Sequence, residues 1–234
     1  MRRNALLRVL ATTCVLGALA GCASAPSGPP VDAPSLVVGD RWQYRVTDNL
    51  RRGTTSLLDV EVTAVVGATA QLRFRYADEF ARTQWVDQVD GRGGLSSGLL
   101  GRPMERPFDP PVQLLAFPLA PGKTWRQVIN TFRTDLDLDG QILIYGKVDG
   151  WAPASAPAGT YEAIYVYRVV QLDDEEFWRT RTTRRDAIWY AAEVKAPLRE
   201  AREAEYTEMD GPDSATIRTE SRVFELMSFQ PGPL

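Results

Sequence analysis

Hydrophobic and polar residues alternate with a period of two along most of the chain after residue 36. The alternating runs are rich in Val, Ile, Tyr, Trp and Thr, which is typical of β-strands with one buried face. No helical pattern separates them, so we expect an all-β domain: a single antiparallel curved sheet or open β-barrel with little helix. The predicted strands are 41–47, 55–66, 70–78, 83–89, 124–133, 141–151, 161–172, 177–184, 187–194 and 216–228.

Three segments fit this pattern less well. Residues 90–111 are so dense in Gly and Pro that we predict a loop through which no strand passes, either a functional lid or a disordered segment. Residues 152–159 are expected to form a Pro-Ala-Gly turn. The charged segment 196–209 fits a short helix or an exposed strand, and we favour the strand.

The first 20 residues follow a different pattern. Arg2, Arg3 and Arg8 are followed by a short apolar run over residues 9–20. This is the layout of a secretory signal peptide, and the run is shorter than the about 20 apolar residues that a membrane-spanning helix needs. We therefore expect export and no transmembrane helix here.

The run ends in Leu19-Ala20-Gly21-Cys22, which resembles the lipobox of bacterial lipoproteins. The resemblance implies cleavage before Cys22 and a covalent lipid such as palmitate on Cys22, with no other cofactor. Two or more acyl chains hold a protein firmly to a membrane. Residue 23 is Ala and not Asp, which by the same resemblance implies an outer-membrane location facing the periplasm.

The resulting organisation has three parts: a signal peptide over 1–21, a tether over 22–35 and a β-rich periplasmic domain over 36–234. The tether is rich in Pro, Ser and Ala and contains little that would pack, so we expect an extended spacer. Cleavage would remove three arginines and change the formal net charge from −3 to −6. A mildly acidic domain without a basic block is not suited to nucleic acid.

The chain contains no histidine, which excludes Ser-His-Asp and Cys-His catalysis and histidine zinc sites. Cys14 would leave with the signal peptide and the sulfur of Cys22 would carry lipid, so no disulfide is expected. We therefore expect a protein that is not an enzyme. A carboxylate- or metal-dependent enzyme stays open as a third alternative.

The metal alternative rests on Asp135, Asp137 and Asp139, which precede Gly140 as in the first half of a calcium loop. The position that should supply a bidentate Glu is Gly146, and the flanks are not helical. A strand end followed by an Asp-Gly hairpin turn explains the same residues.

The six tryptophans and eight tyrosines lie mostly within predicted strands. Most are expected to pack in the core or across strands, and some to line an apolar cavity or to stack on sugars. Our candidates for apolar interior positions that bind a ligand follow. They are Trp42, Tyr44, Trp125, Tyr165 and Trp189.

Four short motifs carry a further resemblance. They are Gly39 to Tyr44, Phe117 to Trp125, Pro157 to Tyr161 and Ile188 to Ala191. Together they resemble bacterial periplasmic β-rich families of unknown function, which are similar in outline to the open half-barrels of lipoprotein carriers. The motifs are turn and core residues, so the resemblance implies a fold more than an activity. Because a barrel interior of this size is able to hold one small ligand, we expect a protein that binds an apolar or amphiphilic envelope molecule without catalysis. The alternative is a structural or interaction lipoprotein whose barrel is filled by its own side chains and whose loops contact another envelope protein.

Overall fold

The computed structural model describes residues 28–77, 84–100, 105–133, 138–172, 179–211 and 214–233. The lipobox and Cys22 lie outside the described residues. Within the described ranges, the chain has no helix whose length and apolar character would let it span a membrane.

Nearly every described element is a β-strand, which confirms the predicted fold class. One 3-10 turn, η1 (Ala192–Val194), lies between β10 and β11. The strands are β1 (Arg41–Asp48), β2 (Thr54–Val66), β3 (Thr69–Tyr76), β4 (Gln84–Val89), β5 (Leu95–Gly98), β6 (Arg106–Val112), β7 (Thr124–Arg133), β8 (Leu138–Ala156), β9 (Gly159–Leu172), β10 (Arg179–Ala191), β11 (Ala196–Gly211) and β12 (Ser214–Gln230).

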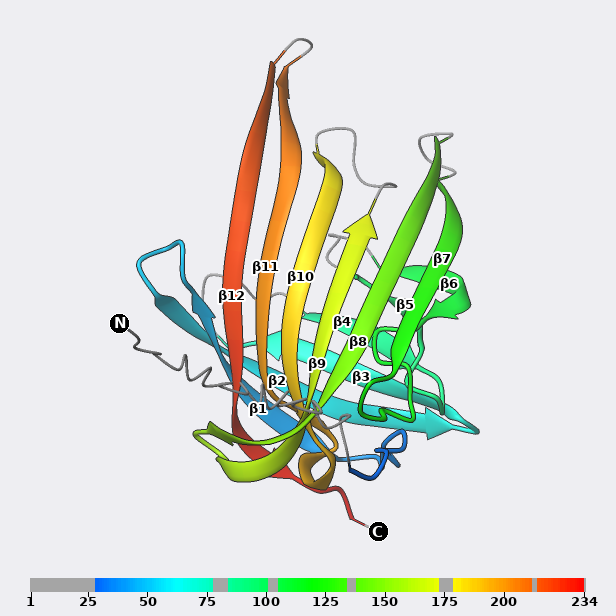
Figure 1. Ribbon diagram of the computed structural model, residues 1–234, viewed down its shortest axis with the longest axis vertical. Helices are drawn as coiled ribbons and strands as arrows, with labels where there is room; N and C mark the ends of the chain where they lie inside the picture. The colour runs from blue at the N-terminus through cyan, green and yellow to red at the C-terminus, as the bar shows by residue number, and fades with distance from the viewer. Residues whose placement is uncertain are drawn as a thin grey trace, which may run out of the picture.

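All twelve strands form one antiparallel sheet in the order β6-β5-β4-β3-β2-β1-β12-β11-β10-β9-β8-β7. The sheet curls on itself, so that β7–β12 stand in front of β1–β5 and cross them steeply (Figure 1). The result is a nearly closed barrel. The β11–β12 hairpin extends beyond the rest of the sheet at one end (Figure 1).

The barrel is closed between β6 and β7 by side chains. Gln127 donates a hydrogen bond to the carbonyl oxygen of Pro111 (2.9 Å) and accepts one from the backbone N–H of Gln113 (2.8 Å). The indole N–H of Trp125 donates to the carbonyl oxygen of Gln113 (3.0 Å). Because β6 contains three prolines, it lacks several of the N–H groups that a regular ladder would use. We call this junction the β6–β7 seam.

Three sequence predictions are corrected here. Residues 90–111 do contain strands, because β5 is very short and β6 is an edge strand, where proline is tolerated. The predicted strands 177–184 and 187–194 are replaced by one strand, β10, since the charged residues between them pair within the barrel instead of forming a turn. Strand β8 continues to Ala156, so the predicted turn over 152–159 is confined to its last residues. The strand preferred for 196–209 is confirmed as β11.

The interior is occupied by three apolar clusters. The first joins β1, β2 and β3 to β11 and β12 and includes Trp42, Leu198 and Leu226. The second joins β5 and β6 to β7, β8 and β9. The third joins β8, β9 and β10 to two segments outside the strands, through Val31 and Leu119. Side chains from opposite walls of the barrel therefore meet in its centre.

Part of the expected tether is docked on the domain. Val31 is buried and forms two backbone hydrogen bonds with Leu119 (2.8 and 2.7 Å). The indole N–H of Trp151 donates to the carbonyl oxygen of Pro29 (3.0 Å). The expectation that this segment packs against nothing is wrong at Val31, because a single Val in a Pro-rich stretch is enough to fill a site in the core.

Candidate functional site

Two of the predicted ligand-binding aromatic residues face the interior and are held there by hydrogen bonds. The indole N–H of Trp42 donates to the carbonyl oxygen of Val194 (2.7 Å), and the hydroxyl of Tyr44 donates to that of Pro197 (3.0 Å). Trp125 also faces inward, at the β6–β7 seam. The polar atoms of these rings are satisfied by the backbone, so their visible role is packing.

Tyr165 and Trp189 do not face the interior. They alternate with the buried residues Ile164, Val166 and Ile188, and therefore lie on the outer face of β9 and β10. The two residues are directly opposite each other, with ring centroids 5.0 Å apart, and the guanidinium of Arg199 lies 5.1 Å from the ring of Trp189. The prediction erred because periodicity identifies two faces of a strand without stating which one is inside.

These two rings belong to a larger group that we call the outer aromatic face, made of Tyr145, Tyr165, Tyr167 and Trp189. The four residues come from the adjacent strands β8, β9 and β10 and point away from the barrel. The side chain of Tyr145 is 41% exposed. Four basic residues lie on the same face of the sheet, and three of them are directly opposite one of the rings. They are Arg126, Lys147, Arg185 and Arg199.

A shallow depression of about 290 Å³ adjoins the outer aromatic face. It lies over β7, β8, β9 and β10, and its lining includes Val128, Leu143 and Arg126. Val128 is 44% exposed, although it is apolar. The outer surface of these strands therefore combines aromatic, aliphatic and basic side chains, a composition that protein interfaces favour.

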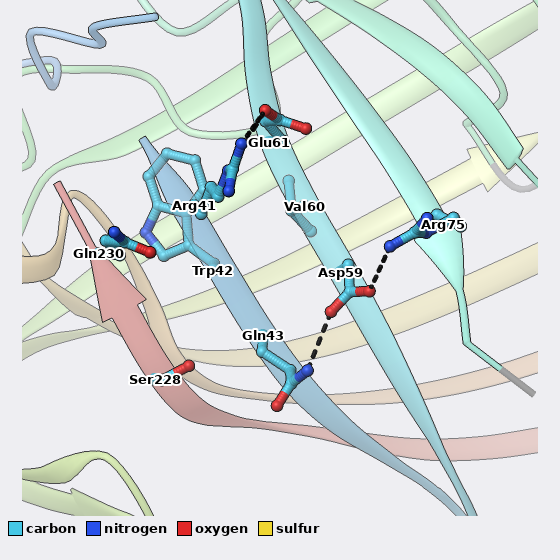
Figure 2. Close-up of a pocket in the computed structure, with 9 residues that line it drawn as sticks. All are labelled: Arg41, Trp42, Gln43, Asp59, Val60, Glu61, Arg75, Ser228 and Gln230. Atoms are coloured by element: carbon cyan, nitrogen blue, oxygen red, sulfur yellow. Dashed lines mark hydrogen bonds and ion pairs between the residues drawn. The ribbon is translucent and has the colours of Figure 1, made fainter. Parts of the chain in front are cut away.

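A second depression, of about 370 Å³, lies over β12, β1, β2 and β3 and is polar (Figure 2). Its charged groups are largely paired with one another. Arg41 contacts Glu61 (2.8 Å), while Asp59 accepts hydrogen bonds from Gln43 (3.0 Å) and Arg75 (3.1 Å) (Figure 2). A ligand would have to compete with these contacts, so this groove is a weaker candidate than the outer aromatic face.

The barrel interior contains a charged cluster that the sequence analysis missed. Arg168 lies 2.7 Å from Asp186 and 3.0 Å from Glu200, and all three side chains are nearly inaccessible to solvent. Arg168 also donates to the carbonyl oxygen of Leu114 (2.9 Å). Arg184 contacts Asp186 (3.1 Å), and Arg202 contacts Glu200 (2.8 Å). We call these five residues the interior ion cluster.

The electrostatics of the interior ion cluster keep Glu200 ionised. Burial alone would raise the pKa of Glu200, but the charges of Arg202 and Arg168 outweigh burial and lower that pKa to about 2. A carboxylate in this state is fully paired and has no proton to give near neutral pH. We therefore assign a structural role to the interior ion cluster. In the sequence, its only sign is that Arg168 and Asp186 alternate in step with apolar residues that face the interior.

The pKa of one interior carboxyl is shifted in the opposite direction to that of Glu200. Burial raises the pKa of Asp87, on β4, to about 6, and the backbone N–H of Leu99 offsets this only in part. Gly98 lies so close that a Cβ atom there would be 2.2 Å from Oδ1 of Asp87. Oδ1 has no hydrogen-bond partner among the described residues.

The proposed calcium ligands fall mostly outside the described residues. Asp135 and Asp137 lie there, while Asp139 is exposed on β8, opposite Phe132. Over the ranges that the structure describes, no three His, Cys, Asp or Glu side chains come together as a metal site would require. The calcium prediction stays a prediction.

No protein-family model matches the chain, and no curated protein matches its sequence. Solved structures of similar outline exist, with low identity. A provisionally assigned lipoprotein from Parabacteroides distasonis has a TM-score of 0.48 and 12% identity, with 87% of this chain and 100% of that chain covered. The hypothetical lipoprotein YmcC from Escherichia coli has a TM-score of 0.38 and 11% identity, with 83% and 86% covered. Because these TM-scores lie below 0.5, the likenesses carry no inference about function.

Proposed function

We propose that this protein is a lipid-anchored component of the bacterial envelope, held by Cys22 at the outer membrane and facing the periplasm. It acts by binding another envelope protein and not by catalysis. The anchor is supported by the lipobox Leu19-Ala20-Gly21-Cys22 at the end of the apolar run. The observation that carries the binding role is the outer aromatic face.

The filled interior favours this role over that of a carrier. Three apolar clusters and the interior ion cluster occupy the space where an apolar ligand would sit. Both depressions described above lie on the outer surface. A ligand entering the barrel would therefore have to displace well-packed side chains, and the loss of that packing would oppose binding.

The outer aromatic face has the properties of a protein-binding surface. Tyr, Trp and Arg are the residue types that contribute most at interfaces, because they bury large areas with few rotatable bonds. Here Tyr165, Trp189 and Arg199 already contact one another, so little conformational entropy remains to be lost on binding. The rigid sheet beneath them holds the surface in one arrangement.

A photoreactive amino acid placed at Tyr167 in the full-length protein, expressed in cells, tests the proposal. A discrete crosslinked product is expected at this position, and the additional change Trp189→Ala should remove it. Thr55, which is exposed on the outer face of β2, is the matched control position and should give no such product. Equal crosslinking from both positions, or insensitivity to Trp189→Ala, would contradict the proposal.

The second candidate function is the binding of an amphiphilic molecule in the barrel, and the β6–β7 seam favours it. The seam is joined by the side chains of Gln127 and Trp125, so it can separate without breaking a strand ladder. Native mass spectrometry of the full-length protein, with extraction of non-covalently bound lipid, distinguishes the two functions. A stoichiometric amphiphile would support the carrier, and an empty protein would support the protein-binding role.

A further inference from the structure

Strand β12 has a free edge where it extends beyond the barrel (Figure 1). On one side β12 pairs with β11 along its upper length, from Arg222 to Ser214. On the other side its ladder with β1 ends at Arg222, opposite Asp48. The backbone N–H of Asn49 then donates to the carbonyl oxygen of Ser221 (2.9 Å). On this side no described strand pairs with the backbone of Ala215, Ile217 and Thr219, and we call the edge that these three residues form the free edge of β12.

The direction of the unpaired backbone groups follows from that last contact. Because the carbonyl of Ser221 points toward β1, and successive residues of a strand point in opposite directions, Ala215, Ile217 and Thr219 point their N–H and C=O groups away from β11. Three residues therefore present unpaired donors and acceptors in a row. Such a row is a template for another strand.

The side chains of the free edge do not oppose strand addition. Residues 214–220 contain no proline and no lysine, the residues that commonly protect an edge. Ile217 is 68% exposed, although it is a large apolar residue. The charges are neutralised within the chain, because Arg218 pairs with Glu208 and Glu220 pairs with Arg179.

We propose that the free edge of β12 pairs with the same edge of a second copy of this chain, antiparallel, with a two-fold axis at Ile217. In this register Ile217 lies opposite Ile217, and Thr219 lies opposite Ala215 of the other protomer. All the outward backbone groups of the three residues are then satisfied, by about six hydrogen bonds. The two sheets become one continuous sheet. This proposal does not depend on the partner proposed for the outer aromatic face.

The register is fixed by the length of the free edge. Strand β1 occupies the position beside Arg222, so the second copy cannot extend past Ser221. The seven residues that remain are centred on Ile217. In this register Arg218 lies opposite Thr216 and Glu220 opposite Ser214, so no like charges face each other directly. A surface that matches itself in this way suits a symmetric dimer.

Cysteine crosslinking of the full-length protein in the oxidising periplasm tests the proposal. Directly opposed residues in a hydrogen-bonded antiparallel pair have Cα atoms about 5.5 Å apart, which a disulfide can span. Ile217→Cys should therefore give roughly tenfold more disulfide-linked dimer than a Cys at an exposed apolar site away from the edge. Val66→Cys is that control, because Val66 is 73% exposed at the end of β2.

A mixed experiment tests the register. Thr219→Cys alone should crosslink poorly, since the two-fold axis separates the two copies of Thr219. Co-expression of Thr219→Cys with Ala215→Cys should give a mixed dimer as strong as that of Ile217→Cys. Efficient crosslinking of Thr219→Cys alone, or no mixed dimer, would overturn the register.

A proline variant tests whether the two copies of β12 form backbone hydrogen bonds with each other or only lie close together. The N–H of Thr219 points away from β11, so Thr219→Pro removes a donor that the fold does not use. Added to Ile217→Cys, it should reduce the linked dimer to the level of Val66→Cys while circular dichroism and the melting temperature stay unchanged. Crosslinking of Ile217→Cys only to other proteins, or at the level of Val66→Cys, would overturn the second copy as the occupant.

Discussion

In the usual pattern, apolar residues face the core and charged residues face the solvent. The two faces of β9, β10 and β11 differ in the opposite sense at several positions. The inner face contains the charged residues Arg168, Asp186 and Glu200, nearly inaccessible to solvent. The outer face contains the aromatic residues Tyr165 and Trp189, partly exposed beside Arg199. Charges inside a barrel must be mutually paired, because isolated buried charges are very costly. Aromatic residues left outside are not needed for the core and are available for binding.

The largest effect is expected from removing one charge of the inner face. Asp186→Asn leaves the guanidinium groups of Arg168 and Arg184 without their shared carboxylate in a buried site. We expect a loss of about 3–5 kcal/mol in the free energy of unfolding, measured by urea denaturation.

The matched change on the outer surface is Glu61→Gln, which removes the partner of Arg41 and Arg73. Exposed ion pairs contribute little, so a loss of at most about 1 kcal/mol is expected. Similar losses in the free energy of unfolding would show that the interior ion cluster stabilises the fold no more than a surface ion pair does.

Two interior carboxyls should give opposite pH dependences. The pKa of Glu200 is lowered to about 2 in the folded protein, so its contribution is present above its ordinary pKa of 4.5 and is lost as the pH falls toward 2. The pKa of Asp87 is raised to about 6, so its ionisation between pH 4 and pH 6 favours the unfolded state.

Asp87→Asn tests the pH dependence that we expect from Asp87. At pH 7.5 the variant should be more stable than the wild type by up to about 3 kcal/mol, because each pKa unit corresponds to about 1.4 kcal/mol. At pH 4 the difference should nearly vanish, since Asp87 is then protonated in the folded protein. Urea denaturation at the two pH values measures this, and an equal effect at both would contradict a raised pKa for Asp87.

The sequence predicted the fold well because strand periodicity is local. Alternation locates β1, β2, β7 and β9 from neighbouring residues alone. The candidate site was predicted poorly because it depends on which face of each strand lies inside, and that is decided by strands distant in the sequence. Trp42 and Trp189 have the same local pattern, yet one lies in the core and the other on the outer face.

The interior ion cluster was missed for a related reason. Arg168, Asp186 and Glu200 are far apart in sequence, and a run such as Arg184-Arg185-Asp186 resembles a turn until β9 and β11 supply its partners. Edge strand β6 was missed because proline normally excludes a strand, and only its place at the end of the sheet order makes the exception possible. In both cases the missing information was which strands lie beside each other in the sheet.

A similarly small effect on stability is expected on the outer aromatic face, at Trp189. Trp189→Ala removes one tilted ring–ring contact and one cation–π contact at a partly exposed position, so we expect a loss of about 1 kcal/mol by urea denaturation. The same change should abolish crosslinking from position 167, because the remaining surface loses its largest ring. Phe229, which stacks on Trp42, is a useful comparison. Phe229→Ala should cost at least as much stability while leaving the crosslink intact, since it lies outside the outer aromatic face. If both variants lost the crosslink in proportion to their loss of stability, the outer aromatic face would have no role beyond packing.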